Sequence, residues 1–269
     1  MNIGDKEFDR ITSFMLNSYG IDLAKKRVLI ESRLKHLVTD SGHDNFEDYV
    51  TAVFQNPKLR QEMVTCLTTN YTFFYREDIH YEFMIKQAMP SILEGTRLPY
   101  NARIWSAGCS AGDEAFTAAM FLRTFQELNP RLSSFSITAT DISSDMLAQA
   151  KAATYSADRI TKLPPMMQKR FFTEDENGQF LVKKELTDKV KFSEFNLMDP
   201  FPPTLTGFDI IFCRNVMIYF TPETRKAMGK KFLNALKPGG YLFIGLSEAL
   251  PAGEIGFKPV RPSIFMREK

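Results

Sequence analysis

Residues 103–114 read RIWSAGCSAGDE, and this stretch decides the fold. Its first four residues have the character of a short buried strand, small residues follow, and two acidic residues open a helix expected over residues 112–127. Small residues between a strand and a helix let the backbone approach a ligand closely, and the helix N-terminus points to the same place. The stretch therefore predicts the first strand–loop–helix unit of an open α/β sheet, with a ligand site at the sheet edge.

Strand and helix patterns alternate through the rest of this region. Further strands are expected at residues 136–140, 190–195, 208–213, 241–246 and 263–267, and a helix is expected at 144–153. Another helix begins at Thr221-Pro222, a hydroxyl cap followed by proline, and ends at the Lys237-Pro238-Gly239-Gly240 turn. We therefore predict an α/β fold with a doubly wound, mostly parallel sheet.

Two other parts of the chain have different patterns. Residues 1–67 show only helical spacing, which predicts an all-helical domain whose second helix begins near Leu23. Residues 163–189 contain a Pro-Pro pair, an Asp/Glu/Asn/Gly turn and two brief apolar runs, which predict a small inserted β-hairpin. We expect a helical domain at 1–67, a linker and lid at 68–101, and an α/β domain at 102–269 with an insert at about 163–189.

Composition and charge exclude several classes of protein. The 34 basic and 32 acidic residues give a formal net charge of +2, which argues against a general nucleic-acid binder. The three cysteines and three histidines show no ligand spacing, so we expect no disulfide framework and no metal site. The N-terminus lacks the apolar region of a signal peptide, and no apolar run is long enough to span a membrane. We therefore expect a cytoplasmic protein without membrane insertion.

The acidic pair Asp113-Glu114 gives the first indication of a ligand. Carboxylates at the start of a helix repel a phosphate but attract an ammonium or sulfonium group. This favours S-adenosylmethionine, whose methionyl end is partly cationic, over a dinucleotide. The alternative is a tight strand–helix turn whose acids only suit the helix dipole.

Polar residues also follow the later strands. Asp141 comes directly after the strand at 136–140, where an acid can accept the two ribose hydroxyls of a nucleoside; the alternative is an N-cap for the next helix. Arg214 and Asn215 follow the strand at 208–213, at the sheet edge where ligands bind. Tyr219 lies one turn further on and could hydrogen-bond a substrate oxygen, or it could simply pack beneath the sheet.

The boundary between the two domains carries a polar and aromatic segment, TTNYTFFYRE at residues 68–77. Hydroxyls, an amide and an arginine beside a run of aromatic rings could form a lid of hydrogen-bonding groups over a ligand. The alternative is an ordinary interdomain linker with buried aromatic residues.

Together these motifs resemble the CheR family, the chemotaxis-receptor glutamate methyltransferases, from about residue 5 to the C-terminus. The most specific match is IFCRNVMIYF at residues 211–220, and TTNYT at 68–72 leading to Arg76 is similar to the family's TTNxTxFFR box. Trp105-Ser106-Ala107, Ala139-Thr140-Asp141-Ile142 and LKPGG at 236–240 also fit. Two departures are mild: GDEAFT stands at 112–117 instead of GEEPYS, and Arg76 follows Phe74-Tyr75 rather than two phenylalanines.

The resemblance implies a sheet of the S-adenosylmethionine-dependent methyltransferase type, with S-adenosyl-L-methionine as cofactor and S-adenosyl-L-homocysteine as product. Asp113 would hold the amino group of the cofactor and Asp141 its ribose. Further cofactor contacts would come from Asn70, Thr72, Arg76, Asn196, Leu197, Arg214 and Asn215, with Asn196 and Leu197 beside the adenine. Arg76 and Tyr219 would be the catalytic pair beside the reacting methyl group.

The resemblance also implies a reaction and a partner. The enzyme would transfer methyl to glutamate side chains of methyl-accepting chemotaxis receptors, forming glutamyl methyl esters for sensory adaptation. A glutamate is already ionised at neutral pH, so no strong base is needed. The enzyme would act as a monomer, and its partner would be the cytoplasmic domain of the receptor. Nucleic acid would have no role.

A basic segment offers a docking face for an acidic receptor helix. Residues 24–36 contain five basic residues and one acidic one, and Lys25, Lys26 and Arg33 are the expected docking residues. The alternative for this segment is a solvated helix face. Two other functions stay open: a methyltransferase for a small molecule or nucleic acid, and a cofactor-binding module without turnover. The first function lacks the Asn/Asp-Pro-Pro-Tyr/Phe motif of DNA amino-methyltransferases, which NLMDPF at 196–201 resembles only weakly. The second function predicts that Arg76 or Tyr219 is replaced, and both residues are present.

Overall fold

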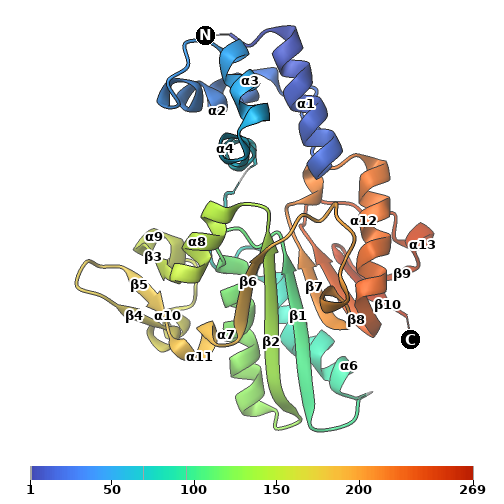
Figure 1. Cartoon of the computed structure of the whole chain (residues 1–269). Coiled ribbons are helices and arrows are strands. Elements are labelled where there is room, and N and C mark those ends of the chain that lie inside the picture. The colour runs from blue at the N-terminus through green and yellow to red at the C-terminus, as the bar shows by residue number, and fades with distance from the viewer. Residues whose placement is uncertain (1, 69, 95, 269) are drawn as a thin grey trace. The chain divides into compact units, whose positions relative to one another are not determined.

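The structure, a computed structural model, describes residues 2–68, 70–94 and 96–268. The chain forms two compact units (Figure 1). The first comprises Met1–Asn70 with Tyr219–Thr224, and the second comprises Tyr71–Ile218 with Arg225–Lys269. Each unit has its own buried core, and they are described in turn.

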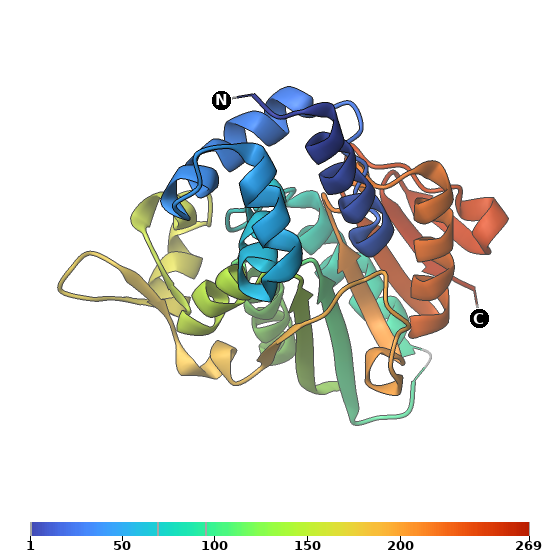
Figure 2. The same ribbon diagram turned by 45° about the horizontal axis from the view of Figure 1, so that its top comes forward.

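The first unit is helical, with its helices in blue in Figures 1 and 2. The helices are α1 (Asp5–Tyr19), α2 (Arg27–Asp40), α3 (Phe46–Gln55) and α4 (Pro57–Leu67). Gly20 ends α1 in the left-handed conformation, with φ 70°. Asn45 and Asn56 cap α3 and α4 through their side chains. The buried faces share aliphatic residues at helical spacing, among them Ile11, Met15, Ile30, Leu34, Val38, Val50, Val53 and Val64.

The predicted start of the second helix, near Leu23, is wrong, because α2 begins at Arg27. The Asp22 carboxylate accepts the backbone N–H of Ala24 at 3.0 Å, which forms a turn instead of a helical start. Ile21 forms an antiparallel bridge with Phe220, and the Asp22 N–H donates to the Tyr219 carbonyl at 2.9 Å. These bonds hold residues 21–22 in an extended conformation and fix the 219–224 segment to the helical unit.

The second unit contains the predicted sheet, and its mostly parallel character is confirmed. Among the described residues, the strands lie in the order β6-β2-β1-β7-β8-β10-β9. Their bounds are β1 (Tyr100–Ala107), β2 (Leu132–Asp141), β6 (Val190–Glu194), β7 (Phe208–Cys213), β8 (Leu236–Ile244), β9 (Phe257–Arg261) and β10 (Ile264–Arg267). The run from β6 to β8 is parallel, whereas β10 is antiparallel to both of its neighbours.

Helices cover both faces of this sheet because alternate side chains of a strand point in opposite directions. Trp105 of β1 contacts Phe232 of α12 (Pro222–Ala235), with ring centroids 5.5 Å apart. Its neighbour Ile104 lies in the hydrophobic cluster that contains Phe116 of α7 (Asp113–Leu128). Further helices of this unit are α5 (Ile79–Phe83), the π-helix η1 (Met84–Ala88), α6 (Met89–Glu94), α8 (Ser144–Ala152) and α13 (Ala252–Ile255). Two short 3-10 segments are η2 (Pro203–Leu205) and η3 (Met217–Tyr219); the last residue of η3 already belongs to the first unit.

The predicted hairpin is present and projects from the second unit in Figures 1 and 2. It consists of β4 (Phe172–Glu174) and β5 (Phe180–Val182), joined by a turn in which Asp175 accepts the N–H groups of Asn177 and Gln179. A third strand, β3 (Thr154–Tyr155), pairs with β5 and was not predicted. Short helices flank these strands: α9 (Ala157–Ile160), α10 (Pro165–Phe171) and α11 (Lys184–Thr187).

Candidate active site

The loop after β1 lies close to its neighbours, which explains its small residues. Gly108, Ser110 and Gly112 all have positive φ, at 83°, 47° and 90°. The N–H groups of Gly108 and Cys109 donate to the Thr140 carbonyl at 2.8 and 3.0 Å. A Cβ on Gly108 would lie 2.5 Å from a methyl group of Val216. A larger residue is therefore excluded at Gly108 by both space and backbone conformation.

Asp141 ends β2 beside this loop. Its carboxylate accepts the backbone N–H of Ser110 at 2.7 Å and that of Ser143 at 2.9 Å. Burial raises the pKa of Asp141, although these N–H donors oppose the shift. The N-cap of α8 is Ser143, whose hydroxyl accepts the N–H of Met146, so the alternative N-cap role for Asp141 is not needed. An acid thus stands at the end of the second strand, as the sequence predicts for a ribose site.

Asp113 has a partner that the sequence did not indicate. It is the first residue of α7 and fully buried, and its carboxylate accepts two bonds from the Arg159 guanidinium, one of them at 3.0 Å from Nε. Burial raises the pKa of Asp113, and Arg159 opposes that shift. Arg159 lies in α9, and its sequence context carries no signal for this ion pair. The negative charge expected at the start of α7 is therefore partly neutralised within the protein.

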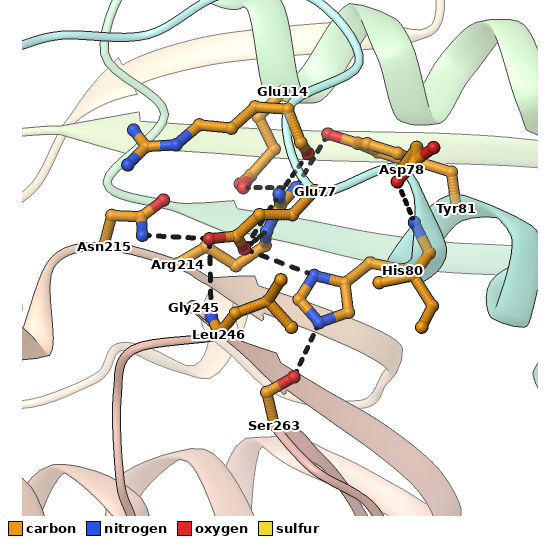
Figure 3. A network of polar contacts seen from close by, with 12 residues as sticks. Glu77, Asp78, His80, Tyr81, Glu114, Arg214, Asn215, Gly245, Leu246 and Ser263 are labelled. Carbon is orange, nitrogen blue, oxygen red and sulfur yellow. Dashed lines mark hydrogen bonds and ion pairs between the residues drawn. The ribbon is translucent and has the colours of Figure 1, made fainter.

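Arg214 is the centre of a buried polar network (Figure 3). Its side chain is 2% exposed, and its Nε donates to Glu77 at 3.1 Å. One terminal nitrogen donates to the Tyr81 hydroxyl at 2.9 Å and lies 3.5 Å from Glu114, while the other donates to the carbonyl of Arg76. Every guanidinium nitrogen of Arg214 is thus bonded within the protein.

Asn215 is held on two sides by carboxylates. It has φ 62°, its backbone N–H donates to Glu248 at 2.9 Å, and its side-chain amide donates to Glu77 at 3.2 Å. Glu248 also accepts the N–H of Ile218 at 3.0 Å, so it holds the chain that leads to Tyr219. Glu77 and Glu248 were not predicted as site residues, although Glu77 directly follows Arg76 and Glu248 lies just beyond the carboxyl end of β8.

The 68–77 segment divides between the two units. Asn70 belongs to the helical unit, where its amide donates to the Thr65 carbonyl at 3.2 Å. Thr72 and Arg76 belong to the second unit and are partly exposed; Arg76 donates to the Tyr71 carbonyl at 2.9 Å. Thr69 lies outside the described residues. Tyr219, the other expected catalytic residue, is partly exposed and belongs to the helical unit.

Asn196 and Leu197 follow β6 in a turn that a lysine stabilises. The Asn196 side chain accepts the N–H of Met198 at 3.0 Å, and Leu197 is buried. Lys231 of α12 donates to the carbonyls of residues 197, 198 and 199 at 2.8 to 3.0 Å. The two residues expected beside the adenine therefore lie at the same sheet edge as Asp141, since β6 pairs with β2 in parallel.

Comparison with known proteins identifies the family. The CheR methyltransferase SAM-binding domain matches residues 70–265, and the CheR methyltransferase all-alpha domain matches residues 6–68. The chain belongs to the CheR methyltransferase family. Its cofactor is accordingly S-adenosylmethionine, as the sequence predicted, and it is a methyltransferase.

Curated relatives agree over nearly the whole chain. A chemotaxis protein methyltransferase of Borreliella burgdorferi is 37% identical over 272 residues, which cover 99% of this chain and 96% of the relative. One from Pseudomonas putida is 34% identical over 93% of this chain and 92% of its own length. One from Vibrio parahaemolyticus is 35% identical over 100% and 99%. The similarity therefore includes both units of this CheR methyltransferase.

Burial shifts the pKa values of several carboxyl groups in the second unit. Burial raises the pKa of Glu114 and of Glu248, as it does for Asp113 and Asp141. Glu77 differs: burial would raise its pKa, but Arg214 and hydrogen bonds from Asn215 and Leu246 lower it below the ordinary value. Small residues that admit a close ligand and an acid at the end of β2 fit the cofactor that the family binds.

The described residues give two further findings on ligands and membranes. They contain no cluster of histidine, cysteine and acidic side chains that could hold a metal ion. None of their helices combines the length and the apolar character needed to cross a bilayer.

Proposed function

We propose that this CheR methyltransferase transfers methyl from S-adenosylmethionine to glutamate side chains of methyl-accepting chemotaxis receptors. The products are glutamyl methyl esters, which serve sensory adaptation. The relatives named as chemotaxis protein methyltransferases support a role in chemotaxis. The acceptor is inferred from the chemistry of the site.

One observation carries the choice of a carboxylate acceptor: the second unit offers no histidine base. His36 and His43 belong to the helical unit, and neither lies in a motif of the site. His80 is fully buried, and burial together with Arg214 lowers its pKa to about 4. An acceptor that must lose a proton commonly uses a histidine base, whereas a glutamate is already ionised and needs none.

In the reaction, a carboxylate oxygen of the receptor glutamate attacks the methyl carbon in line with the sulfur. The bond between methyl and sulfur breaks, its electron pair stays on sulfur, and the products are the ester and S-adenosylhomocysteine. Bound S-adenosylmethionine supplies the electrophilic methyl group. The protein aligns the reactants and excludes water.

We assign the roles as the family resemblance implies. Asp141 takes the ribose and Asp113 the amino group, with Arg159 orienting the Asp113 carboxylate. The remaining cofactor contacts come from Asn70, Thr72, Arg76, Asn196, Leu197, Arg214 and Asn215. Arg214 also holds the backbone of Arg76 in place, because one of its terminal nitrogens donates to the Arg76 carbonyl. Arg76 and Tyr219 hold the attacking carboxylate.

The proposed receptor-docking domain is the segment 1–67, which forms most of the helical unit. Lys25 and Lys26 are exposed just before α2 and suit an acidic receptor helix. Arg33 is also a proposed docking residue, but its guanidinium donates to the Leu67 carbonyl at 2.9 Å, so it caps α4 as well. We infer a monomer that acts in the cytoplasm on the receptor's cytoplasmic domain.

The proposal is tested with radiolabelled methyl on the cofactor and receptor-containing membranes as acceptor. The expected result is label in a receptor band that mild alkali releases as methanol, because carboxyl methyl esters hydrolyse under these conditions. Label that survives alkali would contradict esterification, and label in a small molecule or nucleic acid would favour another acceptor.

A further inference from the structure

The backbone on both sides of Arg76 is strained. Tyr75 and Glu77 adopt the left-handed conformation, with φ 64° and 54°, although neither is glycine. Such residues cost about 1 kcal/mol or more each and persist only where other contacts fix them. We therefore expect strong contacts to fix the 75–77 segment, and the Glu77 carboxylate makes them.

Glu77 joins three segments that are far apart in the sequence (Figure 3). One carboxylate oxygen accepts the side-chain amide of Asn215 at 3.2 Å and the backbone N–H of Leu246 at 3.3 Å. The other accepts Nε of Arg214 at 3.1 Å and lies 3.5 Å from Nδ1 of His80. The side chain is 14% exposed, so water has little access to these bonds.

Arg214 links Glu77 to the backbone of Arg76. The guanidinium that Glu77 binds also donates to the backbone carbonyl of Arg76, the residue just before Glu77. Arg76 is thus fixed through its own carbonyl and through the side chain of its neighbour, both by one buried guanidinium. The Arg76 side chain remains partly exposed and donates to the Tyr71 carbonyl at 2.9 Å rather than to Glu77.

The charges around Glu77 favour its ionised form. Arg214 faces it at 3.1 Å, His80 on the next turn is uncharged at neutral pH, and Glu114 lies on the far side of Arg214 at 3.5 Å. Glu77 therefore supplies the nearer negative charge for a guanidinium that is almost fully removed from water. Loss of that charge would leave Arg214 paired with the more distant carboxylate of Glu114.

We propose that Glu77 is a positioning residue that, through Arg214, fixes Arg76 for contact with the cofactor. This inference rests on the proposed role of Arg76 in binding S-adenosylmethionine. It assigns Glu77 a function in the site without direct contact to the ligand.

The test is a double-mutant cycle on S-adenosylhomocysteine affinity, measured by calorimetry on the full chain. Glu77→Gln keeps the shape and removes the charge, and Arg76→Ala removes the side chain that Glu77 is said to position. We expect Glu77→Gln to weaken binding about 10-fold in the wild-type background, which is about 1.4 kcal/mol. In the Arg76→Ala background we expect a much smaller effect, because the side chain to be positioned is gone and only the contact of Glu77 with Asn215 is still disturbed. Equal effects in both backgrounds, or no effect in the wild type, would overturn the proposal.

Asp209→Asn is the matched control. Asp209 is a buried carboxylate of the same unit that accepts Lys237 at 2.8 Å and the N–H of Arg103 at 2.7 Å near the start of β7, away from the carboxyl ends of the strands. It should lower the melting temperature and leave the affinity unchanged in both backgrounds. A loss of affinity in this control as large as that of Glu77→Gln would mean that general destabilisation explains both.

Two features keep the test decisive. If Glu77→Gln does not fold, Glu77→Asp replaces it in the cycle, because the aspartate keeps the charge but is too short to bind Arg214 and Leu246 together. If the losses of affinity caused by Glu77→Asp and Arg76→Ala add up in the double variant, the proposal is overturned in the same way. Binding needs no methyl acceptor, so a wrong receptor assignment leaves the cycle readable. If Arg76→Ala alone leaves the affinity unchanged, the proposed role of Arg76 fails as well.

Discussion

The uncharged state of His80 predicts a specific loss of stability in mild acid. The ring is fully buried, with Nε2 2.8 Å from the Ser263 hydroxyl. Burial and then Arg214 lower its pKa from 6.5 to about 4, while Glu77 opposes the shift. Below pH 6.5 the unfolded chain binds a proton at His80, and the folded chain does not until about pH 4. Folding stability due to His80 is therefore lost as the pH falls through this window.

The size of the effect follows from the shift. Each pH unit in the window costs about 1.4 kcal/mol, so the interval from pH 7 to pH 5 costs about 2 kcal/mol. His80→Gln removes the titrating ring and keeps an amide that can bond Ser263. The variant should thus lose about 2 kcal/mol less than the wild type between the two pH values, whatever it loses at pH 7.

Urea unfolding at pH 7 and pH 5 measures this difference. Trp105 is the only tryptophan and is fully buried in the second unit, so its fluorescence reports unfolding of the unit that holds His80. Comparing losses cancels other titrating groups, which the two proteins share. Equal losses in the wild type and His80→Gln would refute the reasoning, since they would mean that His80 is protonated equally readily in both states.

Four further predictions concern the site and the docking surface. Arg214→Lys should lower the free energy of unfolding by about 2 kcal/mol or more, because one ammonium cannot bond Glu77, Tyr81 and the Arg76 carbonyl together, and unchanged urea stability would contradict this. Gly108→Ala should weaken S-adenosylhomocysteine binding, and adding Val216→Ala should recover only part, because the clash is relieved but φ stays at 83°; full binding by the single variant would argue against the close approach. Lys26→Glu should raise the receptor KM several-fold with unchanged cofactor affinity. Tyr219→Phe should lower kcat, also with unchanged cofactor affinity. Receptor methylation equal to wild type in either variant would show that the residue does not have its proposed role.

The sequence predicted the parts of the fold that depend on local pattern. The apolar strand and small-residue loop at 103–112 gave β1 and the turn into α7, because a buried strand and a close turn restrict residue type strongly. Asp141 and Arg214 were expected at strand ends, and the parallel sheet brings β1, β2 and β7 to one edge. The family motifs added the cofactor, which residue spacing alone only favoured.

The parts that were missed depend on contacts between distant segments. The start of α2 is delayed by the bridge from Ile21 to Phe220, about 200 residues further on. Arg159 and Glu77 each have an ordinary sequence context and become important only when folding brings them to Asp113 and Arg214. Glu248 has the same explanation, because its partners are backbone N–H groups of the 215–218 loop. Side-chain pairs of this kind follow no periodic pattern and no fixed spacing in the sequence, so the sequence alone does not indicate them.

The central claim is that the methyl group goes to a receptor glutamate. It is tested most directly by fragment mass spectrometry of a chemoreceptor after incubation with the enzyme and S-adenosylmethionine. Methyl groups are expected on glutamate side chains of the receptor's cytoplasmic domain, and they should be absent when Arg76→Ala replaces the wild type. Methyl groups on lysine, on a terminus or on no receptor peptide, from an enzyme that binds the cofactor, would contradict it.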